Sequence, residues 1–275
     1  MKLVLLHIVF LTCSLTFSQN QHELFANKGS FYFYWGWNRA IYSKSDIHFL
    51  GENYDFVLSK ISASDRPSPF TFKTYFSPKY LTIPQYNFRI GYFLSNKINL
   101  SFGADHMKYV MKPFQTTLIS GYIKDIDANY NGTYDEDEFQ VNPNFLQFEH
   151  TDGLNYLNIE TRISECIFSK KIWSINFIYG FGAGMLVPRT DATLMNFQRY
   201  DEFHISGWGI SGLFGIQYNI GRILFIQFEN KTGYINMPAI RTTSNKLDRA
   251  KQDFIFNQFN ASIGFRVLPN QKKLD

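Results

Sequence analysis

The chain has 275 residues, of which 18% are aromatic and 18% charged, and its formal net charge is +4. A length of this order suits one large domain or two small ones. The mild charge, without a dense basic patch, argues against nucleic acid as a partner, and the 29 Phe and 17 Tyr favour strands and membrane interfaces over helical bundles.

The N-terminus, residues 1–18, has the pattern of a secretory signal peptide. Lys2 supplies a positive charge, and the apolar run that follows is too short for a stable membrane anchor. We therefore expect the mature chain to begin at Gln19 and to form a single domain over 19–275. An uncleaved anchor is the alternative. Cys166 would be the only cysteine left after cleavage, so no internal disulfide is expected.

Alternation of apolar and polar side chains predicts eight β-strands, because successive side chains of a strand point to opposite faces. The pattern is clearest in 222–235, where one face carries Leu224, Ile226 and Phe228 and the other carries Gln227, Glu229 and Lys231. Each strand reaches the roughly 9–11 residues that a tilted strand needs to cross a bilayer. The predicted strands are 31–42, 85–95, 98–110, 154–166, 172–186, 204–218, 222–235 and 254–267.

The connections between these strands alternate strictly between short and long. Tight turns lie near 95–97, 169–171 and 219–222, and the long connections are 43–84, 111–153, 187–203 and 236–253. Outer-membrane barrels have this sidedness, with short periplasmic turns and long extracellular loops. The sequence therefore predicts an all-β, antiparallel transmembrane β-barrel of about eight strands in the cell outer membrane.

Two alternatives to this architecture stay open. The segment 53–61 also alternates, and we place it in a hairpin within the first extracellular loop, although it could raise the barrel to ten strands. A secreted β-sandwich or lipocalin-like barrel is the soluble alternative. It would have to turn the charged faces of several strands outward and the aromatic faces inward.

Charged residues on the polar faces of the predicted strands should meet inside the barrel. The interior of an eight-stranded barrel is just filled by side chains, so opposite charges there are expected to form an ion-pair network that plugs the lumen. A narrow channel is the alternative. The expected network comprises Arg89, Asp105, Glu160, Arg162, Glu229, Lys231 and Arg266.

The second long connection contains a calcium-loop pattern. Residues 127–138 match D-x-[DN]-x-[DN]-G-x5-E at every fixed position, although their flanks do not read as helices. Oxygen ligands at this spacing suit Ca²⁺, with the last carboxylate bidentate, and a solvated acidic loop is the alternative. Ca²⁺ is thus the one cofactor that the sequence suggests, with the ligands Asp127, Asn129, Asn131, Thr133, Asp135 and Glu138.

Polar residues at the loop ends of the strands suggest two further sites. His204 and Ser206 lie two apart in a predicted strand, so they would share its lipid-facing side, and a serine beside a histidine is a nucleophile pattern. Basic residues of the same region could hold phosphates of outer-membrane lipid, or could pair with neighbouring carboxylates. That second group comprises His106, Lys108, His150, Asp152, Arg189, Asp191, Arg199, Asp201, His204 and Arg241.

The His204-Ile205-Ser206 motif resembles that of the lipid A deacylases, which are eight-stranded barrels with a membrane-facing His-x-Ser. This chain departs from that family in having Gly207-Trp208 where the family has Asn-Ala, and in lacking an acidic residue to orient the histidine. The resemblance therefore supports an outer-membrane lipid hydrolase only as an alternative function.

Three phrases of the chain resemble uncharacterised outer-membrane β-barrel proteins of Gram-negative bacteria, particularly of the Bacteroidota type. They are GADHMKY at 103–109, FEHTDGLNY at 148–156 and INMPAIRTT at 235–243. The resemblance implies fold and location and brings no catalytic residue with it. We accordingly expect a non-enzymatic role in surface interaction or envelope organisation, acting through the loops 43–84 and 111–153 on a surface or envelope protein partner.

Overall fold

The computed structural model describes residues 27–80 and 82–268. The expected signal peptide, 1–18, and the expected mature start at Gln19 lie outside the described residues. Within the described ranges, no helix has the length and apolar character needed to cross a membrane.

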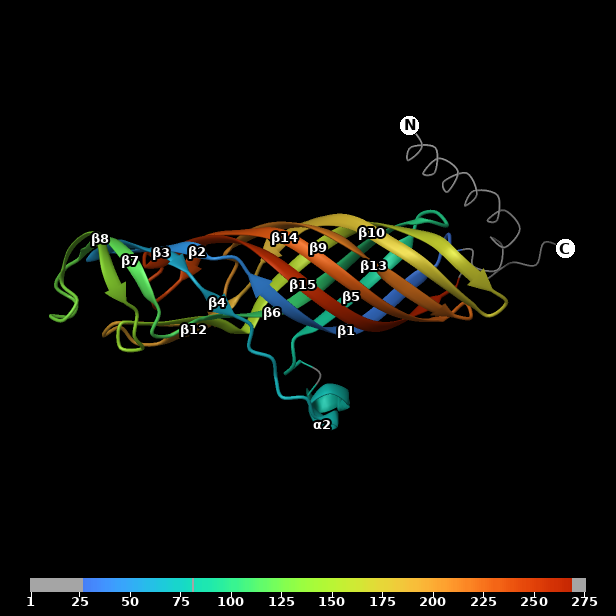
Figure 1. Ribbon diagram of the computed structural model, residues 1–275, viewed down its shortest axis with the longest axis horizontal. Helices are drawn as coiled ribbons and strands as arrows, with labels where there is room; N and C mark the ends of the chain where they lie inside the picture. Colours follow the sequence, from blue (N-terminus) through green and yellow to red (C-terminus); the bar gives the residue numbers. More distant parts are fainter. Residues whose placement is uncertain (1–26, 81, 269–275) are drawn as a thin grey trace, which may run out of the picture.

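Eight antiparallel strands pair side by side into a closed ring (Figure 1). Closure comes from the first and last strands, which pair along their whole common length from Phe31↔Val267 to Tyr42↔Phe256. In ring order the strands are β1 (Phe31–Tyr42), β5 (Tyr86–Phe93), β6 (Ile98–Met111), β9 (Leu146–Lys170), β10 (Trp173–Leu186), β13 (Gly207–Ile220), β14 (Leu224–Arg241) and β15 (Arg249–Val267).

The remaining strands extend the sheet beyond the long-connection end of the ring, so the sheet has fifteen strands in the described residues (Figure 1). Four of them continue outward from β15 in the order β2 (Ser45–Gly51), β3 (Tyr54–Ile61), β7 (Thr116–Ile123) and β8 (Gly132–Gln140). The others are β4 (Ala63–Ser64) on β6, β11 (Arg189–Leu194) on β9, and β12 (Tyr200–Phe203) on β11. Two short helices, α2 (Phe72–Phe76) and η1 (Pro78–Tyr80), lie in the first long connection.

The ring strands overlap all eight predicted strands, and the differences concentrate at the long-connection end. β9 begins at Leu146 rather than at 154, and β15 begins at Arg249 rather than at 254, because both continue into the extension. The segment 54–61 forms β3 in a hairpin with β2 and takes no part in the ring. The predicted strand 204–218 instead runs from 207 to 220. Its start coincides with the end of β10 at Leu186, just before Pro188, which has no N–H to continue a regular ladder.

The outward faces of the ring strands form an apolar belt. Large side chains exposed on it include Ile90, Phe102, Ile159, Phe181, Phe214, Phe228 and Phe259. Aromatic pairs lie towards its two ends, Phe31 with Tyr92 at one and Trp208 with Tyr234 at the other. An apolar outer band bordered by aromatic rings, around a polar interior, is the surface of a lipid-embedded barrel and not of a soluble one. Closed pairing and the belt place the protein in the outer membrane. From the short and long connections we expect the extension on the extracellular side, and we name it so below.

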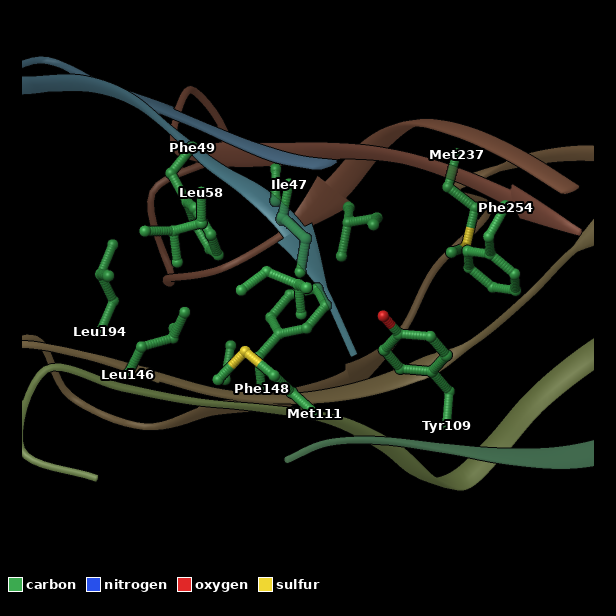
Figure 2. Close-up of a cluster of buried hydrophobic side chains, with 14 of the residues drawn as sticks. Ile47, Phe49, Leu58, Tyr109, Met111, Leu146, Phe148, Leu194, Met237 and Phe254 are labelled. Carbon is green, nitrogen blue, oxygen red and sulfur yellow. The ribbon is translucent and has the colours of Figure 1, made fainter. Parts of the chain in front are cut away.

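The interior has three layers along the barrel axis. Near the periplasmic turns lies an aromatic cluster of Tyr32, Tyr34, Phe93 and Phe225. A polar layer follows at the level of the belt. The extracellular extension then encloses a large apolar core, which receives side chains from the ring strands and from β2, β3 and β11, among them Phe49, Tyr109, Phe148, Leu194 and Phe254 (Figure 2). The long connections are thus folded, and together they enclose a hydrophobic core.

We expect Phe56→Ala to destabilise the protein by about 3–5 kcal/mol, because it leaves a cavity in a close-packed core. Phe56 is fully buried and stacks on Phe49 at a ring-centroid distance of 5.1 Å. Phe228→Ala in the belt, where the ring is 61% exposed, is the matched control and should cost less. Urea unfolding in detergent micelles measures both losses, and equal losses would contradict the extracellular core.

Candidate functional site

The polar layer of the lumen is centred on Glu160, which projects inward from β9. One carboxylate oxygen, Oε1, lies 2.9 Å from Nη2 of Arg89 and 2.7 Å from Nζ of Lys231. The other oxygen, Oε2, accepts a hydrogen bond of 2.6 Å from Nε of Arg162. A single buried carboxylate thus holds three cations from three different strands.

Two more carboxylates complete the network. Oδ2 of Asp105 lies 2.6 Å from Nζ of Lys231, and Oε2 of Glu229 lies 2.9 Å from Nη1 of Arg162. Each of the six charged residues is at most 5% exposed. Three cations therefore face three carboxylates, and the charges balance within the layer. Balance matters because an unpaired charge in a buried site carries a large desolvation cost.

Neutral side chains make the remaining hydrogen bonds of the network. The Tyr34 hydroxyl accepts hydrogen bonds from Nε of Arg89 (3.1 Å) and Nη2 of Arg162 (2.9 Å). Amide side chains supply further contacts: Asn158 accepts from Arg89, Asn87 donates to Asp105, and Gln227 and Asn260 donate to Glu229. A buried ionic cluster needs such additional hydrogen bonds if it is to hold together.

Arg266 lies in the lumen with the other six residues but outside their network. Its Nη2 donates to Oε1 of Gln217 (2.6 Å) and Oδ1 of Asn219 (2.7 Å), and its guanidinium lies 5.1 Å from the centre of the Phe225 ring. Among the described residues, no carboxylate lies within ion-pair distance of Arg266. Its position on a polar strand face predicts an ion pair, but the side chain contacts amides and aromatic rings instead.

These contacts leave little room for solute passage through the barrel. A cavity of about 20 Å³ lies between Arg162, Arg266 and the periplasmic aromatic cluster. A volume of that order holds about one water molecule. The apolar core lies above the polar layer, and the aromatic cluster lies below it.

The calcium-loop residues are divided between a turn and a strand. Oδ1 of Asp127 accepts two hydrogen bonds from Asn129, and Oδ1 of Asn131 accepts the N–H groups of Ile126 and Asp127. Asp135 and Glu138 belong to β8, together with Thr133. Among the described residues, no group of three or more acidic, histidine or cysteine side chains is placed to hold a metal ion. Calcium binding at 127–138 stays a prediction, and it would require β8 to rearrange.

His204 and Ser206 lie in the connection that precedes β13, not in a strand. Nε2 of His204 accepts the N–H of Arg241 at 3.0 Å, while its Nδ1 lies 3.3 Å from the carbonyl of Glu202. Burial lowers the pKa of this ring below its usual value. Ser206 is buried, and its hydroxyl has no hydrogen-bond partner within the described ranges. In this geometry the lone pair that a general base needs is already occupied, and Ser206 does not face lipid.

The basic residues at the extracellular strand ends pair with their acidic neighbours. Arg189 contacts Asp152 at 2.7 Å and Asp201 at 2.9 Å, and Arg199 contacts Asp191 at 2.5 Å. These are partly exposed pairs, each of which contributes little to stability. These pairs leave Arg189 and Arg199 less available for lipid phosphate than unpaired arginines would be.

Two surface features were missed from the sequence, because both lie in segments treated as loops. One is β8, the outermost strand, whose acidic run 135–138 was considered only as part of a calcium loop. The other is the segment around α2, where Phe70 and Phe72 are 76% and 78% exposed. In the sequence this segment is marked by phenylalanines and lysines among the prolines of 67–79.

No protein-family model matches the chain, and no curated protein matches it. Among solved structures, the outer membrane protein OprG from Pseudomonas aeruginosa is 11% identical, over 88% of this chain and 98% of its own, with a TM-score of 0.41. The outer membrane protein AlkL is 13% identical, over 90% and 94%, with a TM-score of 0.40. Ail, the attachment invasion locus protein of Yersinia pestis, is 11% identical, over 87% and 99%, with a TM-score of 0.34. At these identities and TM-scores, none of the three structures transfers an activity to this chain.

Removing the central carboxylate should destabilise the barrel strongly. We expect Glu160→Ala to cost about 3–5 kcal/mol, because three buried cations then face only two carboxylates. Glu165→Ala on the same strand is the matched control, since Glu165 is half-exposed and pairs with Lys97 at 3.7 Å; it should cost less than about 1 kcal/mol. Unfolding midpoints in urea compare the two, and a mild effect of Glu160→Ala would contradict the network.

The geometry around His204 also predicts the outcome of a hydrolase test. Cells that carry Ser206→Ala should have the same lipid A and phospholipid profile as cells with the unaltered protein, because Nε2 of His204 cannot accept the serine proton while it is bonded to Arg241. Mass spectrometry of extracted lipids measures the profile. A lipid species that accumulates only in the Ser206→Ala strain would restore the hydrolase alternative.

Proposed function

We propose that this protein is a non-conducting surface protein of the outer membrane that binds a basic, extended segment of a partner protein at the free edge of β8. Two features support a surface role over a channel. The lumen is filled by a balanced ionic layer, and apolar residues close it on both sides. The extracellular sheet, in contrast, extends beyond the ring by four strands and ends at β8, whose residues are mostly exposed.

The observation that carries the proposal is the position of β8 as the last strand of the extracellular sheet. One edge of β8 pairs with β7, and no strand of the described chain pairs with its other edge. An unpaired edge presents N–H and C=O groups that can pair with an added strand. Proteins that recognise extended peptides use this mode, in which main-chain hydrogen bonds give affinity and side chains give specificity.

Charge defines the kind of strand that this edge accepts. Asp135, Glu136, Asp137 and Glu138 are consecutive and exposed. Glu136 has a positive φ of 58°, and the ladder to β7 shifts register between Ile119 and Gly121, so a bulge divides the edge. Four carboxylates repel a second copy of the same edge and attract a basic segment. A bulge also limits uncontrolled strand pairing.

The test measures binding of designed peptides to the protein in lipid vesicles. A basic peptide with strand propensity should bind the unaltered protein. A variant that carries Asp135→Asn, Glu136→Gln, Asp137→Asn and Glu138→Gln should bind at least about tenfold more weakly, a loss of about 1.4 kcal/mol or more. A peptide of equal charge with prolines at alternate positions should also bind weakly, because proline removes the N–H groups that a ladder needs.

The matched control is a variant with Glu52→Gln and Glu202→Gln, which removes exposed carboxylates outside β8. It should bind the basic peptide as the unaltered protein does. An equal loss per carboxylate in the two variants, of which the control removes two and the β8 variant four, would mean that general surface charge, and not the β8 edge, holds the peptide. Unchanged binding of the proline peptide would exclude strand addition.

A further inference from the structure

A short helical segment is fastened to the outside of the barrel wall. α2 begins after Thr71, whose side chain accepts the N–H of Thr74, and ends at Ser77. Tyr75 is its buried residue: its hydroxyl accepts a hydrogen bond of 2.8 Å from Nη2 of Arg39 on β1 and donates one of 3.0 Å to the carbonyl of Ser68. The helix is therefore held to the ring through a specific side-chain contact.

Aromatic contacts show which side of the wall the segment covers. Trp37 faces outward from β1, because the buried residues Tyr34 and Asn38 belong to the opposite face of that strand. Its ring lies 5.9 Å from that of Tyr75 and 5.2 Å from that of Phe76, measured between centroids. Figure 1 accordingly shows α2 standing beside the ring next to β1, rather than beyond the end of the barrel.

The outer side of the segment is apolar and uncovered. Phe70, Phe72 and Phe76 are 76%, 78% and 44% exposed, and the rings of Phe72 and Phe76 stack at 4.9 Å. These rings continue a line of outward-facing aromatic residues on the wall, where Trp35 stacks on Tyr86 at 4.7 Å. Exposed aromatic rings that continue a lipid-facing surface are expected to contact lipid as that surface does.

The charge of the segment fits a phosphate-bearing surface. Residues 67–85 contain Lys73 and Lys79 and no acidic residue, whereas Arg66 just before them pairs with Glu149 at 2.6 Å. Lys73 lies between Phe72 and Phe76 in the sequence and Lys79 follows them, and Nζ of Lys73 lies 5.3 Å from the centre of the Tyr80 ring. Segments that lie in a membrane interface combine apolar rings, which enter the acyl boundary, with lysines that reach the headgroups.

We propose that residues 66–80 form a lipid-docking segment. Phe70, Phe72 and Phe76 enter the outer leaflet beside the barrel wall, and Lys73 and Lys79 contact lipid phosphates. The occupant of this surface is the bilayer itself, because the segment lies against the wall and adjoins the apolar belt. It gives the barrel a lateral anchor on one side only, next to β1.

The experiment measures the depth of residue 72 in vesicles of phosphatidylcholine and phosphatidylglycerol. Phe72→Cys in a Cys166→Ser background carries an environment-sensitive fluorophore, and the lipids carry nitroxide quenchers at shallow or deep acyl positions. We expect the shallow quencher to reduce emission at residue 72 at least twofold, comparable to a label at Phe102→Cys in the belt. A label at Glu136→Cys on β8 should remain unquenched.

Two further arms separate lipid from other occupants. Lys73→Gln with Lys79→Gln should raise the label towards water in anionic vesicles more than in vesicles of phosphatidylcholine alone. Diluting the labelled protein with unlabelled protein, or with lipid of the same quencher content, should leave quenching by the nitroxide lipids unchanged.

Emission from residue 72 that resembles water and resists both quenchers would overturn the proposal. A signal that depends on protein density without lipid quenching would also overturn it, because a second copy would then cover the surface. Heat-modifiable gel mobility establishes that each variant has a folded barrel, so a loss of quenching reports the segment and not unfolding.

Discussion

Within a bilayer every backbone N–H and C=O group must find its partner inside the protein, and the pairing of β1 with β15 is what makes this possible here. Without it, both strands would present unpaired edges to lipid. Closure fixes the other constraints in turn. Each ring strand must be apolar on the outside, so its polar residues all face a common interior, and that interior is narrow because the ring has eight strands.

The interior then has to accommodate buried charged side chains. Charged side chains from β5, β6, β9 and β14 share one enclosed layer, and Glu160 satisfies three of them at once. The solution balances charge but fills the space that a channel would use. An apolar core lies on the extracellular side of the layer, and an aromatic cluster lies towards the periplasmic turns. The surfaces that remain for interaction are therefore the extracellular sheet and the outside of the wall.

Much of the ring could be predicted from the sequence because lipid on one side imposes a period of two along every spanning strand; Glu229 and Lys231 were placed inward for that reason. The partners within the lumen could not be predicted, because Asp105 and Lys231 are 126 positions apart and only the register brings them together. Arg266 has the same pattern as Arg162, yet it lies beyond reach of any carboxylate of the described chain. Outside the membrane the alternation is a weaker guide: β7 places Ile119 and Ile123 in the extracellular core while β8 faces water, so the sequence pattern does not identify them as strands.

The sealed interior has a consequence for how the chain is assembled. Once β15 pairs with β1, no route of polypeptide width remains through the lumen, so β2, β3, β7 and β8 have to be translocated while the ring is still open. The extracellular sheet cannot be completed at that stage, since β2 pairs with the start of β15, at Arg249 to Gln252. The last strand to arrive therefore finishes two structures, a barrel in lipid and a sheet in water.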